Sequence, residues 1–431
     1  MKAVGKLRAM ISKARQTGLG HIFGANTINQ IIAFASSFIL IRILSKSENG
    51  VYSYAFNIYS FFALMNGFGI ESACLQRCSE TAKNSEKADS YLKFGMLFGS
   101  KINIFLGCLI AISGLCFSFP LEGVGRMLFL FALMPFVTTV FNCIQTYFRY
   151  NLLNVEYSKC SVVNTVLILC GSVAGAYLFK ATGLILFREL AMAVSIVIGI
   201  YVYKFPVMRI FKAVKISLAE KKDMLRLAVI SMVNVATGQL LYLIDVFLIG
   251  IIISDEIIVA SYKTATIIPN ALLFIPSALV VYIYPYFAQN QENKTWVKEK
   301  FFMVLKYFAP LNALVSIVLI IFAPLIIRIV FGSQYLDAVP VFRILSISYF
   351  FSATFRKVIG NLLVTQRKLN VNFWVGILEG LLNIISNWIL IHLFGAIGAA
   401  ITTLIISIVS SAVLMCYFVK YLNREIRKEE K

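Results

Sequence analysis

Residues 395–419 read GAIGAAITTLIISIVSSAVLMCYFV and contain no charged side chain. A helix of about twenty apolar residues spans the hydrocarbon core of a bilayer, which is about 30 Å thick. Comparable stretches recur along nearly the whole chain, at about 21–43, 50–74, 94–119, 126–148, 160–179, 183–203, 225–252, 258–287, 302–331, 338–362, 371–392 and 395–419. The sequence therefore predicts an all-α, polytopic membrane protein with twelve transmembrane helices.

The composition of the chain agrees with this prediction. Hydrophobic residues make up 59% of its 431 residues, and charged residues only 14%. A soluble domain of this length has too little interior to bury so many apolar side chains. Much of the protein surface is therefore expected to face lipid.

The net charge of +20 follows from membrane topology. Lys and Arg gather in both terminal segments and in every second gap, whereas the gaps at 45–50 and 118–123 contain few of them. The basic gap residues are Arg77, Lys83, Lys87, Lys93, Lys204, Arg209, Lys212, Lys215, Lys221, Lys222, Arg226, Lys294, Lys298, Lys300, Lys306, Arg356, Lys357, Arg367 and Lys368. Under the positive-inside rule these gaps and both termini are cytoplasmic. No nucleic-acid partner is expected from charge placed in this way.

The longest polar gap, 204–223, divides the twelve stretches into six and six. We expect a basic N-terminal segment (1–20), an N-terminal lobe (21–203), a cytoplasmic linker (204–223), a C-terminal lobe (224–419) and a basic tail (420–431). An even number of spans in each lobe makes the lobes parallel repeats. A short likeness agrees with this, because Tyr52 and Ala55 recur as Tyr262 and Ala265, 210 positions later.

Two segments resemble a known family. ASSFILIRILSKSENGVYSYAFNI (35–58) and FGSQYLDAVPVFRILSISY (331–349) are similar to the bacterial polysaccharide, or O-antigen, flippases called Wzx-type, of the multidrug/oligosaccharidyl-lipid/polysaccharide exporter superfamily. The resemblance implies two six-helix lobes in a V-shaped arrangement around a central cavity, in the bacterial inner membrane. It also implies transport of undecaprenyl-diphosphate-linked oligosaccharide from the cytoplasmic to the periplasmic face, with membrane lipids and other polysaccharide-assembly proteins as further partners.

Other functions remain open at this stage. A multidrug exporter of the same superfamily is one alternative, and a membrane polysaccharide polymerase is another, although such enzymes usually need a long periplasmic loop. Nucleotide-binding and zinc-protease motifs are missing from the sequence, and it contains only two histidines. We therefore expect no enzyme activity, no cofactor and no metal site, and we expect an ion gradient (H+ or Na+) or the substrate gradient to drive transport.

Ionisable residues inside a membrane are costly, so they are candidates for function. Four lie in helices that the resemblance places along the cavity: Arg42, Glu71, Asp245 and Lys263. Arg42 either binds substrate phosphate through its guanidinium or reaches toward the outer headgroups. Asp245 and Lys263 lie at similar depths, roughly 12 and 8 Å below the outer surface. They form either a structural ion pair or a titratable, ligand-contacting pair.

Further candidates are uncharged. Polar side chains that can bond either sugar hydroxyls or neighbouring helices are Asn26, Gln30, Asn57 and Asn234. Prolines that remove backbone hydrogen bonds, and so predict a kinked gate in the stretch 258–287, are Pro269, Pro276 and Pro285. Glu379 stands between Gly376 and Gly380, a spacing typical of closely packed helices.

Overall fold

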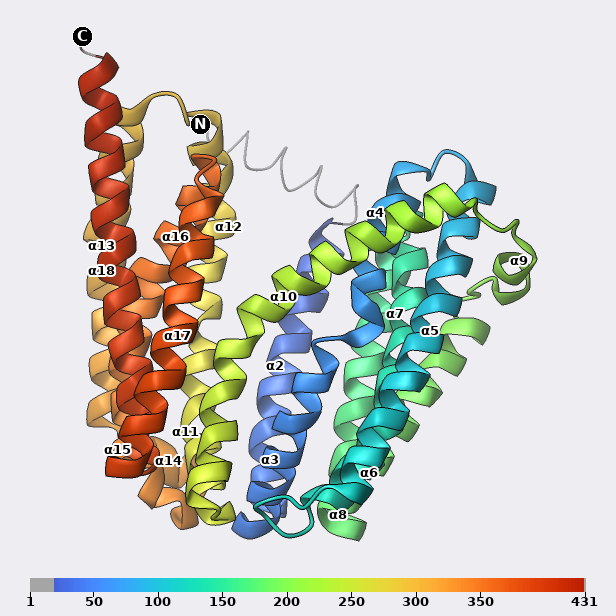
Figure 1. Cartoon of the computed structure of the whole chain (residues 1–431), viewed down its shortest axis with the longest axis horizontal. Coiled ribbons are helices and arrows are strands. Elements are labelled where there is room, and N and C mark those ends of the chain that lie inside the picture. Colours follow the sequence, from blue (N-terminus) through green and yellow to red (C-terminus); the bar gives the residue numbers. More distant parts are fainter. Residues whose placement is uncertain (1–18, 430–431) are drawn as a thin grey trace. The chain divides into compact units, whose positions relative to one another are not determined.

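The computed structural model describes residues 19–429. The predicted N-terminal segment (1–20) therefore lies almost entirely outside the described residues. Helices make up nearly all of the described chain, which contains no strand. Figure 1 gives their arrangement. The elements are α2 (Leu19–Ile43), α3 (Lys46–Ala63), η1 (Asn66–Gly69), α4 (Ile70–Glu80), α5 (Ser85–Cys116), α6 (Val124–Leu130), η2 (Phe131–Leu133), α7 (Met134–Tyr150), α8 (Asn154–Tyr201), α9 (Val207–Lys212), α10 (Leu218–Ile253), α11 (Glu256–Leu272), α12 (Phe274–Gln289), α13 (Lys294–Ile321), α14 (Ala323–Val330), η3 (Ser333–Ala338), α15 (Val339–Phe351), η4 (Ser352–Arg356), α16 (Lys357–Thr365), α17 (Leu369–Phe394) and α18 (Ala396–Glu429).

Ten helical segments of the described residues are long and apolar enough to cross a membrane. One of them, α8, folds back on itself at Phe179 and Lys180, where the backbone leaves the helical conformation. Its two arms meet so closely that a Cβ added to Gly175 would lie 2.2 Å from the carbonyl oxygen of Gly183. The all-α, polytopic class is thus confirmed, and the number of twelve helices stays a prediction.

The chain forms two compact units, residues 1–239 and 240–431. In the first unit α2 packs along α8, and the Asn29 amide donates a hydrogen bond of 2.8 Å to Ser161 Oγ. Helix α5 packs against α4, α6 and α7 in the same unit. The side chains of Leu92 on α5 and Ile144 on α7 are fully buried there.

The second span of the first unit is broken at Asn66-Gly67-Phe68-Gly69. Both glycines have positive φ, a conformation that glycine adopts without steric cost. Asn103 of α5 secures the break, since its Oδ1 accepts a 2.8 Å bond from the Gly67 N–H and its amide donates to the Pro135 carbonyl at 3.0 Å. One buried amide therefore connects the broken helix to α5 and α7.

The predicted linker is tied to the first unit. Arg209 forms an ion pair of 2.6 Å with Asp89, and Lys93 donates to the Ala213 carbonyl at 2.7 Å. At the start of α10, Glu220 pairs with Lys87, and this ammonium, together with bonds from Ser217, lowers the pKa of Glu220 to about 2. A further ion pair joins Asp223 to Arg77. Segment 204–223 is therefore held against the ends of α4 and α5.

The second unit packs α15 against α11, α13 and α18, and α17 against α18. The rings of Phe301 and Phe418 meet edge to face, 5.0 Å apart, in its core. Pro324 cannot donate to the Ile320 carbonyl, and α13 ends at the next residue, Ile321. Arg343 Nε donates to this freed carbonyl at 3.2 Å.

The two units repeat local features at nearly constant offsets. Ser45 caps α3 and Asp255 caps α11, 210 positions later. In each unit a fully buried asparagine, Asn103 or Asn312, bonds a threonine hydroxyl on the following span, Thr139 at 2.5 Å or Thr354 at 3.1 Å. These equivalences support the proposal that the lobes are parallel repeats.

Candidate binding site

A cavity of about 430 Å³, with many polar side chains in its lining, lies inside the second unit. It is bounded by α10, α11, α15, η4, α17 and α18. Its polar lining consists of Tyr242, Asp245, Tyr262, Lys263, Thr266, Asn270, Ser348, Tyr349, Ser352, Arg356, Glu379, Asn383, Thr403 and Ser407. The volume falls within the range of small-molecule sites, about 300–1,000 Å³.

Asp245 is the centre of a hydrogen-bond cluster on one wall of this cavity. Its Oδ2 accepts bonds from the Tyr262 hydroxyl at 2.9 Å and from Thr403 Oγ1 at 2.8 Å. Its Oδ1 accepts bonds from the amides of Asn383 at 2.9 Å and Asn387 at 2.7 Å. Four neutral donors therefore surround this carboxyl group, and the residue is only 8% exposed.

The structure brings Asp245 and Lys263 to the same cavity but does not join them. Of the two alternatives for these residues, the structural ion pair is not formed, and the role of each residue in ligand binding stays a prediction. The four donors occupy the acceptor positions that a carboxylate offers, so the ammonium gains little by approaching it. Among the described residues, Lys263 Nζ has no hydrogen-bond acceptor and no ion-pair partner.

Arg356 is the main residue that the sequence analysis missed. It was grouped with the cytoplasmic cations, yet it lines the cavity and binds Glu379 through Nε and Nη2, each at 2.5 Å. Ser348, Ser352 and Arg356 follow at intervals of four, so they share one helix face, and this spacing could have revealed the residue.

Close packing at Gly376 was also a wrong expectation, since no atom lies within 4 Å of an added Cβ there, and the same holds at Gly380.

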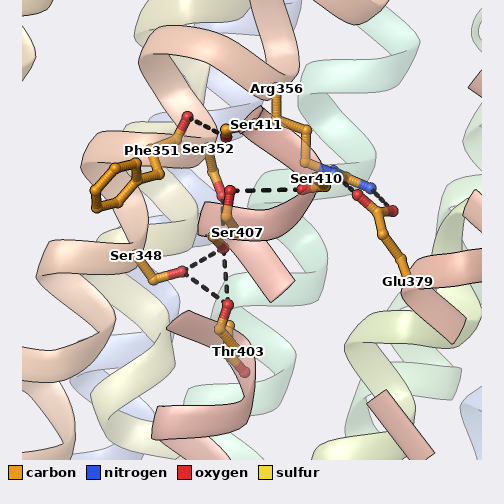
Figure 2. A network of polar contacts seen from close by, with 9 residues as sticks. All are labelled: Ser348, Phe351, Ser352, Arg356, Glu379, Thr403, Ser407, Ser410 and Ser411. Atoms are coloured by element: carbon orange, nitrogen blue, oxygen red, sulfur yellow. Dashed lines mark hydrogen bonds and ion pairs between the residues drawn. The ribbon is translucent and has the colours of Figure 1, made fainter. Parts of the chain in front are cut away.

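Figure 2 shows a group of hydroxyl side chains beside the Arg356–Glu379 pair, and one of them, Thr403, also bonds Asp245. Ser407 of α18 bonds Ser348 at 2.7 Å and Ser352 at 3.0 Å, and donates to the Thr403 carbonyl at 2.8 Å. We call Ser348, Ser352, Thr403 and Ser407 the hydroxyl row. It connects α15 and η4 to α18 by side chains that can also bond sugar hydroxyls.

The charged candidates of the first unit have separate surroundings. Glu71 begins α4 and accepts bonds from Thr139 Oγ1 at 3.2 Å and from the Asn142 amide at 2.8 Å. Arg42 lies in the last turn of α2 with an exposed side chain. The role of each in substrate binding stays a prediction.

The uncharged candidates also differ from one another. Asn26 and Gln30 are exposed on α2. Asn57 on α3 is buried, and neither its amide nitrogen nor its oxygen has a partner among the described residues. The side chain of Asn234 lies outside the described residues.

One of the three prolines marks a helix break. Pro276 cannot donate to the Leu272 carbonyl, and α11 ends at Leu272 while α12 begins at Phe274. Pro269 lies within α11 on the cavity wall, and Pro285 lies exposed within α12. A moving gate at this break remains a prediction.

Comparison with known proteins places the chain in a family. The model of the family described as "Polysaccharide biosynthesis protein" matches residues 39–340. The chain belongs to this family. No curated protein matches it.

Solved structures share the fold. An inward-facing multidrug resistance MATE family transporter of the MOP superfamily has a TM-score of 0.76 at 14% identity, with 94% of this chain and 99% of that chain covered. The lipid II flippase MurJ in an inward closed conformation has a TM-score of 0.72 at 14% identity, with 94% and 90% covered. The expected superfamily fold is thereby confirmed: the chain is a multi-pass membrane protein with the fold of MOP-superfamily transporters.

Proposed function

We propose that the protein is a flippase that moves an undecaprenyl-diphosphate-linked oligosaccharide from the cytoplasmic to the periplasmic face of the bacterial inner membrane. The observation that carries the proposal is the set of polar side chains that line the cavity of the second unit, in a chain of a polysaccharide biosynthesis family. Its hydroxyl row and amides suit sugar hydroxyls, and Lys263 supplies a cation without a local acceptor. Transport then exposes these residues to each face of the membrane in turn.

The Asp245 cluster is the proposed site of the coupling ion. Among the described cavity residues, Asp245 is a buried carboxylate without an ion-pair partner, so it is the acidic group that we assign to the coupling ion, H+ or Na+. Asn387 Oδ1 is buried with no donor among the described residues, so it offers a second oxygen ligand. Hard cations bind sets of carboxylate, carbonyl and hydroxyl oxygens, and the Thr403 hydroxyl proton can rotate away to complete such a set.

The transport assay uses purified protein in liposomes with a fluorescent undecaprenyl-diphosphate oligosaccharide. We expect the protein to accelerate exposure of the labelled glycan to a membrane-impermeant quencher, and Lys263→Ala to slow it. A rate equal to that of protein-free liposomes would refute the flippase proposal. The superfamily fold also fits a multidrug exporter, so ethidium efflux is measured in parallel, and efflux without glycan transport would favour that alternative.

A further inference from the structure

Arg356 lies on a continuous cavity-facing side of the span formed by α15, η4 and α16. Residues Leu345, Ser348, Tyr349, Ser352 and Arg356 stand at positions i, i+3, i+4, i+7 and i+11, and all line the cavity. The last two are the first and last residues of η4, a π-helical turn between α15 and α16. Single π turns inside α-helices are rare and are frequent at functional sites. The end of this turn therefore directs a guanidinium to the cavity wall.

Glu379 occupies only one edge of that guanidinium. A guanidinium carries five N–H donors, and Glu379 binds those of Nε and Nη2. Three hydrogens remain, two on Nη1 and one on Nη2, and the Tyr242 hydroxyl is a hydrogen-bonding neighbour of the group. The Glu379 side chain is 3% exposed and that of Arg356 is 33% exposed. Glu379 thus fixes the plane of the guanidinium and leaves a second edge accessible.

One of the two cations that line the cavity, Lys263, has no hydrogen-bond acceptor among the described residues. Asp245 accepts four hydrogen bonds from neutral donors, and Glu379 is bound to Arg356. Lys263, on the facing helix α11, has no acceptor among the described residues. The formal charges of Asp245, Glu379, Lys263 and Arg356 sum to zero. Both carboxylates, however, already accept hydrogen bonds from groups other than Lys263. An oxyanion from outside would supply the missing acceptor.

We propose that Arg356 and Lys263 together bind an oxyanion of the transported molecule, and that Glu379 is a positioning residue for Arg356. This inference rests on the proposed function. Both sources of an oxyanion in a lipid-linked glycan, the diphosphate and the carboxylate of an acidic sugar, accept paired N–H donors from a guanidinium. The ammonium of Lys263 adds a compact charge from the other helix.

The test reverses the ion pair, in the full-length protein in nanodiscs, with Arg356→Glu combined with Glu379→Arg. The reversed pair keeps the contact between the two helices but moves the guanidinium to α17. Its matched control reverses an ion pair of the same unit away from the cavity, with Glu425→Lys combined with Lys428→Glu. Binding of undecaprenyl diphosphate, of its conjugate with a neutral oligosaccharide and of a conjugate containing a uronic acid is measured by native mass spectrometry.

We expect the reversed pair to keep the thermal unfolding temperature and to lose at least about tenfold in affinity, about 1.4 kcal/mol, while the control binds as the wild type does. A loss for all three ligands identifies the diphosphate as the bound group. A loss confined to the uronic acid conjugate identifies the sugar carboxylate.

Affinities within about twofold of wild type for all three ligands would overturn the inference and leave the flippase proposal intact. Failure of the wild type to bind any of them would overturn both. If the reversed pair does not fold, Lys263→Met and Arg356→Lys decide, because neither leaves Glu379 without a cation. Unchanged affinity in both of these variants would also overturn the inference.

Discussion

At Asp245 the protein keeps a carboxylate inside the membrane with neutral donors instead of a cation. Four hydrogen bonds from α11, α17 and α18 converge on it. The bonds serve two purposes, since they give both buried carboxyl oxygens hydrogen-bond partners and they hold four helices together. Loss of the acceptor therefore affects stability as well as transport.

We predict that Asp245→Asn lowers the unfolding temperature and abolishes transport. The new amide nitrogen cannot accept a bond, so buried donors are left unpaired, each at a cost of about 1–3 kcal/mol. Thermal unfolding in detergent and the liposome assay measure the two effects. The matched control is Asp255→Asn, because asparagine also caps helices well and Asp255 is the half-buried N-cap of α11, outside the cavity lining. Equal unfolding temperatures for the two variants would contradict the prediction.

The sequence predicted part of this site for a clear physical reason. Asp245 and Lys263 stand in apolar stretches, where any charge is costly and hence conspicuous. Arg356 escaped notice because it stands next to Lys357 at the predicted end of a span, where cations are common. Asn383 and Asn387 carry no charge, and their role depends on Asp245 of another helix. Such a partnership arises only in the folded unit.

Among the elements, the span formed by α11 and α12 has the clearest discontinuity. The break between Leu272 and Phe274 contains the cavity-lining residue Leu273 and follows the cavity-lining residue Asn270. Helix breaks were predicted equally at three prolines, but only Pro276 produces one. Proline removes a bond at each site, and the surrounding packing decides whether the helix separates there.

We predict that Pro276→Ala reduces transport while expression and folding stay normal, because it restores a backbone donor to the Leu272 carbonyl and favours a continuous helix. Initial rates in the liposome assay measure the effect. Pro285→Ala is the control, since Pro285 is exposed and lies within an unbroken helix. The same rate in both variants would mean that the break only serves packing.

For the whole molecule, the alternation of basic and non-basic gaps predicts an orientation. Positions 84 and 215 lie in basic gaps and position 122 in a non-basic one, and all three side chains are exposed.

The helical architecture could be predicted from apolar length alone, because every backbone group must be paired within the lipid. The turn inside α8 was placed correctly between 179 and 183, whereas the break at Asn66–Gly69 was missed, because it depends on Asn103 of another helix.

We predict that a membrane-impermeant maleimide labels Glu122→Cys in intact cells and does not label Asn84→Cys or Lys215→Cys. The exposed native thiols Cys108, Cys116, Cys170 and Cys416 are first replaced by serine. Permeabilised cells provide the control, in which all three positions react. Labelling at position 84 before permeabilisation would reverse the proposed topology.

Segment 204–223 has one mechanical consequence. Twenty residues of free chain would be a slack tether between the two halves of a transporter, but here ion pairs pin this chain to the first unit as far as Asp223. No slack remains beyond that point, because α10 runs as one helix from Leu218 to Ile253, across the boundary between the units. Movement of one unit against the other therefore requires α10 to bend or twist. High salt, which screens exposed ion pairs, would lengthen the tether.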